Sequence, residues 1–135
     1  MRWILIGCLW AGVALAGPTS VQELHLALLK ANPGYEGNAQ TNANAKGEII
    51  AVSLRGAKVT NLEPLKGLPL EGLDLAGVQA RDLSPLQGMR LTVFYAEQSL
   101  VEDIGVLKGM PLTEVYLTDT KVVDIKPLAG AKIKS

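Results

Sequence analysis

The sequence predicts an α/β solenoid, a stack of short repeats in which each repeat supplies one β-strand and one short helical turn. Two observations predict this fold class. A single pattern recurs every 21 residues, with repeats that start at residues 49, 70, 91 and 112 and a stub of a fifth at 133. Within each repeat, alternating apolar positions give way to a short segment that ends in glycine. A unit this small cannot bury its apolar side alone, so neighbouring repeats must stack.

The first half of each repeat has the two-residue period of a strand with one buried face. Four positions, the first, fourth, sixth and eleventh, are apolar throughout: Ile49, Leu70, Leu91, Leu112 and Ile133; Val52, Leu73, Phe94 and Val115; Leu54, Leu75, Ala96 and Leu117; Val59, Ala80, Val101 and Val122. Because segments of equal length connect successive strands, the strands must run parallel. In the third repeat Ala96 replaces the expected leucine, and we expect the larger Phe94 to fill the lost volume.

The second half of each repeat predicts a short helical turn. It begins with Asn61, Asp82, Asp103 or Asp124, side chains that cap the free N–H groups of a helix start, and usually continues with proline, although Val106 replaces it in the third repeat. A glycine then closes the turn at positions 67, 88, 109 and 130. The aspartate column could instead bind Ca²⁺, but capping explains it without a metal.

This pattern resembles the leucine-rich repeat, in its short bacterial, internalin-like form, over residues 49–133. The resemblance implies a parallel β-sheet on the concave face and short 3₁₀ or helical turns on the convex face. It implies a function in binding proteins rather than in catalysis. The asparagine that this family carries at the ninth position is replaced by Ala57, Val78, Ser99 and Thr120, so no side-chain ladder is expected there.

Residues 17–48 depart from the repeat and predict an N-terminal helical cap with a connecting loop. Ser20 and Glu23 form a capping box, and the Asn-Pro-Gly segment at 32–34 ends the helix. The apolar residues Val21, Leu24, Leu28 and Leu29 are expected on one face. Residues 35–48 fit a hairpin or loop over the first repeat. Residues 49–135 form the repeat domain.

The first 16 residues predict a signal peptide. Arg2 precedes an apolar run, and the small residues at 14 and 16 fit cleavage near Ala16. An uncleaved anchor and lipidation at Cys8 are the alternatives. Cleavage would remove the single cysteine, leaving an exported chain, secreted or periplasmic in a bacterium and not inserted in the membrane, that packing alone must stabilise.

Charge and composition offer little material for catalysis or for nucleic-acid binding. The chain carries 13 basic and 13 acidic residues, and the basic ones are scattered rather than clustered on a stripe. The single histidine, His25, is expected at the surface of the helix or partly packed. Without metal-ligand spacing or a phosphate-binding loop, we expect neither an enzyme nor a cofactor.

The concave face is where the sequence predicts binding. Side chains at the third, fifth and seventh positions point away from the core. Candidate partner-binding residues are Arg55, Asp74, Val93, Tyr95, Glu97, Glu114, Tyr116 and Thr118. Tyr95 and Tyr116 fall in one column of adjacent strands, where they could contact a protein ligand or simply form a stabilising cross-strand pair.

The sequence therefore predicts an exported, non-enzymatic module that binds a protein ligand of unknown identity through its concave face. The alternative is a structural protein that self-associates through its C-terminal repeat. The sequence stops three residues into a fifth repeat, and Val115, Leu117 and Val122 would have only Ile133 to cover them. This edge could be tolerated, could pair with a second molecule, or could continue in a longer array.

Overall fold

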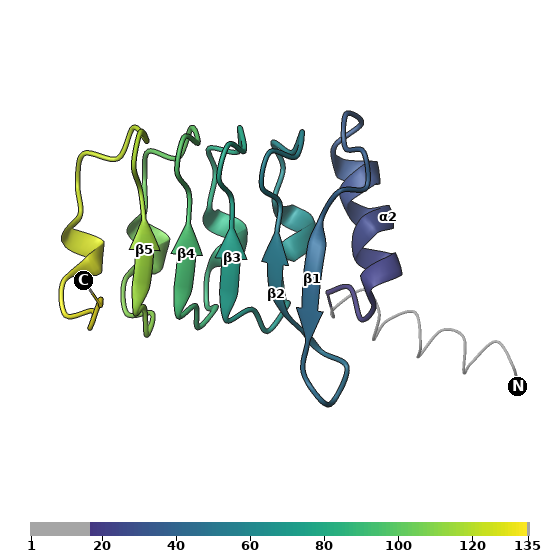
Figure 1. The fold of residues 1–135 in the computed structure, drawn as a ribbon, viewed down its shortest axis with the longest axis horizontal. Helices are drawn as coiled ribbons and strands as arrows, with labels where there is room; N and C mark the ends of the chain where they lie inside the picture. Colours follow the sequence, from purple (N-terminus) through teal and green to yellow (C-terminus); the bar gives the residue numbers. More distant parts are fainter. Residues whose placement is uncertain (1–16, 135) are drawn as a thin grey trace, which may run out of the picture.

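The computed structural model describes residues 17–134 and shows one sheet with short turns behind it. The sheet contains five strands in chain order: β1 (Gln40–Ala43), β2 (Ile49–Ser53), β3 (Gly72–Asp74), β4 (Val93–Tyr95) and β5 (Glu114–Tyr116). Helix α2 (Val21–Ala31) packs at the β1 end, and the strands follow one another along the long axis (Figure 1). The signal peptide predicted for residues 1–16 lies outside the described residues.

Strands β2 to β5 pair in parallel with a constant offset of one repeat. Ala51 faces Gly72 across β2 and β3, and Gly72 in turn faces Val93. Tyr95 faces Tyr116 across β4 and β5 in the same way. Because each step advances by one repeat, every column of the sequence becomes a straight row across the sheet. The predicted parallel solenoid is confirmed.

Four 3₁₀ turns line the convex side: Glu63–Leu65, Ser84–Leu86, Gly105–Leu107 and Lys126–Leu128. The polar residue before each turn caps it as predicted. Asp82 Oδ1 accepts a hydrogen bond from the Ser84 N–H at 2.9 Å, and Asp103 does the same for Gly105 at 2.8 Å. This hydrogen bond lowers the pKa of Asp82. Each carboxylate therefore caps the 3₁₀ turn of its own repeat by accepting a backbone hydrogen bond.

Two columns of the repeat have left-handed backbone. The predicted glycine column is one of them, with φ of 84° at Gly67 and 83° at Gly88. The other follows the strand, where glycine occupies the first two repeats but Gln98 (φ 55°) and Asp119 (φ 57°) occupy the next two. A left-handed conformation is unfavourable for a residue with a Cβ, so these two turns are strained relative to their glycine counterparts.

A single apolar core runs through the stack from Leu24 in α2 to Leu112 at the start of the fourth repeat. Phe94 and Ala96 are both fully buried in it at 0% exposure. They point to the same side of β4, so the phenyl ring occupies volume beside a position that leucine fills in the other repeats. This arrangement fits the predicted compensation.

Helix α2 begins with the predicted cap and buries two of its apolar residues. The Ser20 side chain accepts from the Glu23 N–H at 3.2 Å, while the Glu23 carboxylate accepts from Thr19. These hydrogen bonds to Thr19 lower the pKa of Glu23. Of the four apolar residues expected on one face, Leu24 and Leu28 are buried against the stack, whereas Val21 and Leu29 are 40% and 50% exposed.

Asn32 joins this helix to the first repeat. Its side-chain oxygen accepts from the N–H groups of Thr60 (2.9 Å) and Asn61 (2.8 Å). Its side-chain nitrogen donates to the carbonyl oxygens of Leu28 (3.2 Å) and Asn61 (3.0 Å). The side chain is buried and fully paired, so it fixes α2 against the turn that opens the first convex segment.

The segment between the helix and the first repeat contributes strand β1, which pairs antiparallel with β2. Thr41 faces Val52, and the register shifts by a bulge between Asn42 and Ala43. The hairpin therefore extends the sheet by one strand at the N-terminal end (Figure 1).

The fourth repeat exposes apolar residues that earlier repeats bury. Ile125 is 65% exposed, whereas Leu62, Leu83 and Ile104 in the same column are at most 3% exposed. Val123 is 92% exposed in a column that is also exposed in the earlier repeats, and Ile133, at the start of the fifth repeat, is 40% exposed. Val115, Leu117 and Val122 are only partly buried. The C-terminal side of this repeat thus presents an apolar surface to solvent.

Candidate protein-binding surface

The concave surface of the sheet is built from alternate residues of each strand. Positions three, five and seven of the repeat point out of the sheet, because positions four and six point into the core. One row runs through Ser53, Asp74, Tyr95 and Tyr116, and its members are aligned by the parallel pairing. The strands are short and stacked, so the backbone positions these side chains rigidly.

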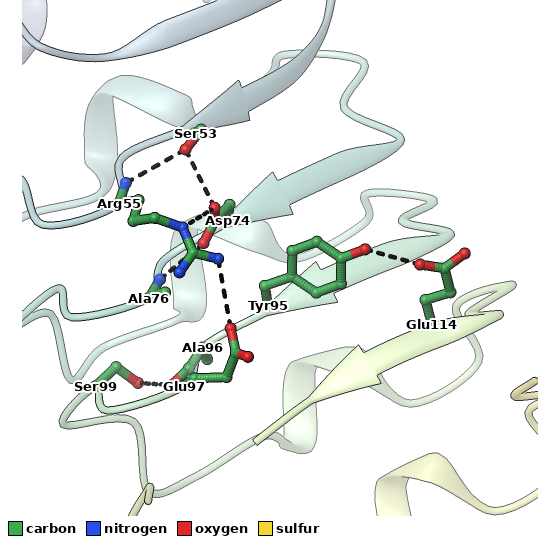
Figure 2. Close-up of polar contacts among 9 residues, drawn as sticks. All are labelled: Ser53, Arg55, Asp74, Ala76, Tyr95, Ala96, Glu97, Ser99 and Glu114. Atoms are coloured by element: carbon green, nitrogen blue, oxygen red, sulfur yellow. Dashed lines mark hydrogen bonds and ion pairs between the residues drawn. The ribbon is translucent and has the colours of Figure 1, made fainter. Parts of the chain in front are cut away.

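Tyr95 and Tyr116 contact each other in this row. Their ring centroids are 5.0 Å apart with an interplanar angle of 53°. The Tyr95 hydroxyl donates to Glu114 Oε2 at 2.7 Å (Figure 2). That hydrogen bond is the main cause that raises the pKa of Tyr95 to about 12, so the phenol stays neutral at physiological pH. Tyr116 is 50% exposed, so about half of the residue faces solvent.

A second polar group lies on the neighbouring strands. Arg55 Nε donates to Asp74 Oδ2 at 2.9 Å, and Arg55 Nη2 reaches Glu97 Oε2 at 3.5 Å. Ser53 and the Ala76 N–H also donate to the Asp74 carboxylate. Figure 2 shows this group beside Tyr95, with Glu97 extending from the next strand toward the guanidinium. Hydrogen bonding to Asp74 is the largest cause that raises the pKa of Arg55.

The outward positions of β2 to β5 and of the residues that follow them carry an excess of negative charge. Arg55 is their one basic residue, and Asp74, Glu97 and Glu114 are their acidic ones. Asp74 is paired with Arg55, which leaves Glu97 and Glu114 with little compensation, on either side of the two tyrosines. The half of the surface formed by β4 and β5 therefore carries both the tyrosines and the uncompensated acidic residues.

A hollow of about 290 Å³ lies beside this half, toward β1. The small residues Ala51 and Gly72 form part of its floor, and Tyr95 and Asp74 border it. Gln40 and Asn42 of β1 line it as well, although no pattern in the sequence singles them out. Their segment lacks an apolar alternation, so only the pairing of β1 with β2 reveals that they reach this face.

The structure brings the predicted binding residues onto one surface. Val93, Tyr95 and Glu97 are half-buried, while Arg55, Tyr116 and Thr118 are exposed. Asp74 faces Tyr95 across β3 and β4, and Glu97 reaches Arg55, so the two groups are contiguous. The predicted role of these residues in binding a partner stays a prediction.

The residues considered for other chemistry have structural partners. His25 is partly packed, and its Nδ1 shares a hydrogen bond of 2.6 Å with the Tyr35 hydroxyl. The Tyr35 hydroxyl in turn accepts from the Ala39 N–H at 3.0 Å, so the pair fixes the loop after α2. Across residues 17–134, no three His, Cys, Asp or Glu side chains come together as a metal site. None of the helices described there is long and apolar enough to cross a membrane.

Comparison with solved structures identifies the architecture. Internalin C2 from Listeria monocytogenes str. 4b F2365 superposes with a TM-score of 0.53 and 36% sequence identity. The match covers 56% of this chain and 35% of the internalin chain, so this chain spans about a third of that protein's length. No protein-family model and no curated protein matches the sequence. The predicted resemblance to internalin-like repeats is confirmed at the level of the fold.

Proposed function

We propose that this internalin-like leucine-rich repeat solenoid is a non-enzymatic module that binds a protein ligand through its concave face. The observation that carries the proposal is the pair of tyrosines on adjacent parallel strands, one of them 50% exposed, within a polar rim. Tyrosine is enriched among residues that dominate binding energy, because it buries a large amphipathic surface at small entropic cost. Leucine-rich repeats of this type generally bind proteins, which supports the same function.

The rigidity of the surface favours this function over simple stabilisation of the sheet. The hydrogen bond from Tyr95 to Glu114 and the ion pair between Arg55 and Asp74 hold the side chains before any ligand arrives. A preorganised surface loses less conformational entropy on binding.

The test is a selection of folded protein domains from a displayed library against the full chain, followed by affinity measurements on variants. Tyr116→Ala should weaken the selected binders by about tenfold or more, the loss typical of a central interface residue. Leu26→Ala is the matched control, because it removes an apolar side chain that is 65% exposed on α2, away from the sheet. Binders that respond equally to both substitutions would contradict concave-face recognition.

Export is part of the proposal and rests on the sequence of residues 1–16. If the signal peptide is cleaved near Ala16, the protein recovered from a bacterial periplasm or culture medium begins with Gly17. The intact mass of the exported protein measures this directly. A mass that retains the leader, or that includes a lipid on Cys8, would support one of the alternatives.

The exposed apolar residues of the fourth repeat favour a second candidate function, self-association of two copies. Ile125 and Val123 are exposed and apolar, and a second copy could bury them. Light scattering coupled to size exclusion tests this on the full chain and on Val123→Lys with Ile125→Lys. A dimer that these substitutions dissociate into folded monomers would place assembly ahead of recognition, whereas a monomeric parent would exclude it.

A further inference from the structure

We infer that the concave face recognises a basic side chain of its ligand, arginine or lysine, between Tyr95, Tyr116 and the carboxylates of Glu97 and Glu114. This inference rests on the proposed function and specifies the chemistry of the partner. It follows from three features of the described residues: the spacing of the rings, the uncompensated charge and the guanidinium that the face already holds.

The ring spacing allows one cationic group to contact both tyrosines. Cations are attracted to an aromatic face within about 6 Å of its centroid. The centroids of Tyr95 and Tyr116 are 5.0 Å apart, so a single group can lie within that range of both.

The carboxylates supply the electrostatic part of the site. Glu114 uses Oε2 to accept from the Tyr95 hydroxyl, and no described residue donates to its Oε1. Glu97 contacts Arg55 at 3.5 Å, a distance at the long limit of a hydrogen bond, and its side chain is 33% exposed. Both groups are thus placed to attract a cation at the edge of the aromatic pair.

Arg55 shows that this surface accommodates a guanidinium. Its side chain lies between carboxylates on two adjacent strands, with Nε on Asp74 and Nη2 toward Glu97 (Figure 2). One repeat further along the sheet, Tyr95 and Thr118 occupy the positions of Asp74 and Glu97, so an incoming basic side chain there would meet an aromatic ring in place of a second paired carboxylate.

Other occupants fit this surface less well. An aliphatic side chain could pack on Tyr116, but it would bury Glu97 and Glu114 without neutralising them, which is unfavourable. An acidic side chain or a phosphate would be repelled by both carboxylates. A basic side chain can contact the aromatic rings and neutralise the carboxylates at the same time.

Nuclear magnetic resonance of the full chain, with labelled tyrosine rings, tests the inference using two blocked tripeptides, acetyl-Gly-Arg-Gly-amide and acetyl-Gly-Leu-Gly-amide. The arginine peptide should shift the ring signals of Tyr95 and Tyr116 saturably, in roughly the millimolar range expected of a single side chain. The leucine peptide should not. Raising the ionic strength from about 0.05 M to about 0.5 M should weaken the arginine response several-fold.

Matched variants separate the contribution of the carboxylates to peptide binding from that of the aromatic rings. Glu97→Gln with Glu114→Gln should reduce the affinity for the arginine peptide at least fivefold. Glu102→Gln, an exposed carboxylate on the far side of the repeat, should leave it unchanged. Tyr116→Phe should retain binding, because the aromatic face remains, whereas Tyr116→Leu should lose it.

The outcomes distinguish this inference from the proposed function. Recognition of a basic side chain would be overturned if the arginine and leucine peptides shifted the tyrosine signals equally. It would also be overturned if Glu97→Gln with Glu114→Gln left the affinity for the arginine peptide unchanged. Concave-face binding would still stand if the selected domains lose affinity with Tyr116→Ala. If Tyr116→Ala left the affinity of the selected domains unchanged, the proposed function itself would be overturned.

Discussion

A double-mutant cycle at Phe94 and Ala96 tests whether the third repeat is internally compensated. Both side chains are 0% exposed and lie on the core side of β4. Phe94→Leu removes three carbon atoms, which at ~0.8 kcal/mol per methylene-sized group should lower the free energy of unfolding by about 2 kcal/mol. Ala96→Leu inserts the same number into a packed core and should cost about 1–3 kcal/mol.

The double variant recreates the leucine pair of Leu73 and Leu75 in the preceding repeat. It should be more stable than the sum of the single effects predicts, with a coupling energy of about 0.5–3 kcal/mol. Urea unfolding followed by far-ultraviolet circular dichroism gives the four free energies, with unchanged m-values as the check on two-state behaviour. Additive effects, within about 0.5 kcal/mol, would refute compensation.

Three further predictions concern the cap, the turns and the concave face. Asn32→Ala should lower the free energy of unfolding by about 2 kcal/mol in urea, because it removes a buried side chain that pairs two part-buried backbone N–H groups, and a loss no larger than that of Asn61→Ala would contradict its role. Gln98→Gly should raise the free energy of unfolding by about 0.5–1 kcal/mol, because relief of the strained left-handed backbone at this position exceeds the entropic cost of glycine. A lower thermal midpoint in this variant would argue against backbone strain. Carbon NMR of the rings should show Tyr95 ionising near pH 12 and the Glu114→Gln variant nearer pH 10. The raised pKa means that the hydrogen bond stabilises the fold below pH 10 and is lost as the pH rises toward 12, and an unchanged titration in the variant would exclude Glu114 as the cause.

The periodic part of the fold could be predicted from the sequence because each column has one physical task. Apolar residues at alternate positions specify a buried strand face, and one offset specifies the parallel register. The glycine column specified its own left-handed turn, as Gly67 shows. The concave residues follow from the same alternation, so the repeat spacing alone places Tyr95 and Tyr116 in one row.

Features that depend on contacts between distant segments could not be predicted in this way. Asn32 looked like a helix stop, and its partners Thr60 and Asn61 are 28 and 29 residues away. Strand β1 carries polar residues on an edge of the sheet, so no apolar pattern marks it. Helical spacing places four apolar residues on one face of α2, but it does not say which of them come close enough to the stack to be buried.

The bonds made by the concave side chains were also beyond the sequence. The column pattern placed Glu114 beside the tyrosines, but only the three-dimensional arrangement shows that its carboxylate accepts from Tyr95 and leaves Glu97 near Arg55. Side-chain direction within a row depends on rotamers, which no spacing rule fixes. The distribution of charge around the rings, and hence the preferred ligand, follows from these bonds.

The most direct test of the central claim is transfer of saturation by NMR from an unlabelled selected ligand to the labelled full chain. Binding through the concave face predicts the strongest transfer at Tyr95, Tyr116 and the methyl groups of Val93 and Thr118. The strongest transfer at Val123 and Ile125 would instead place the ligand on the C-terminal repeat and contradict the account.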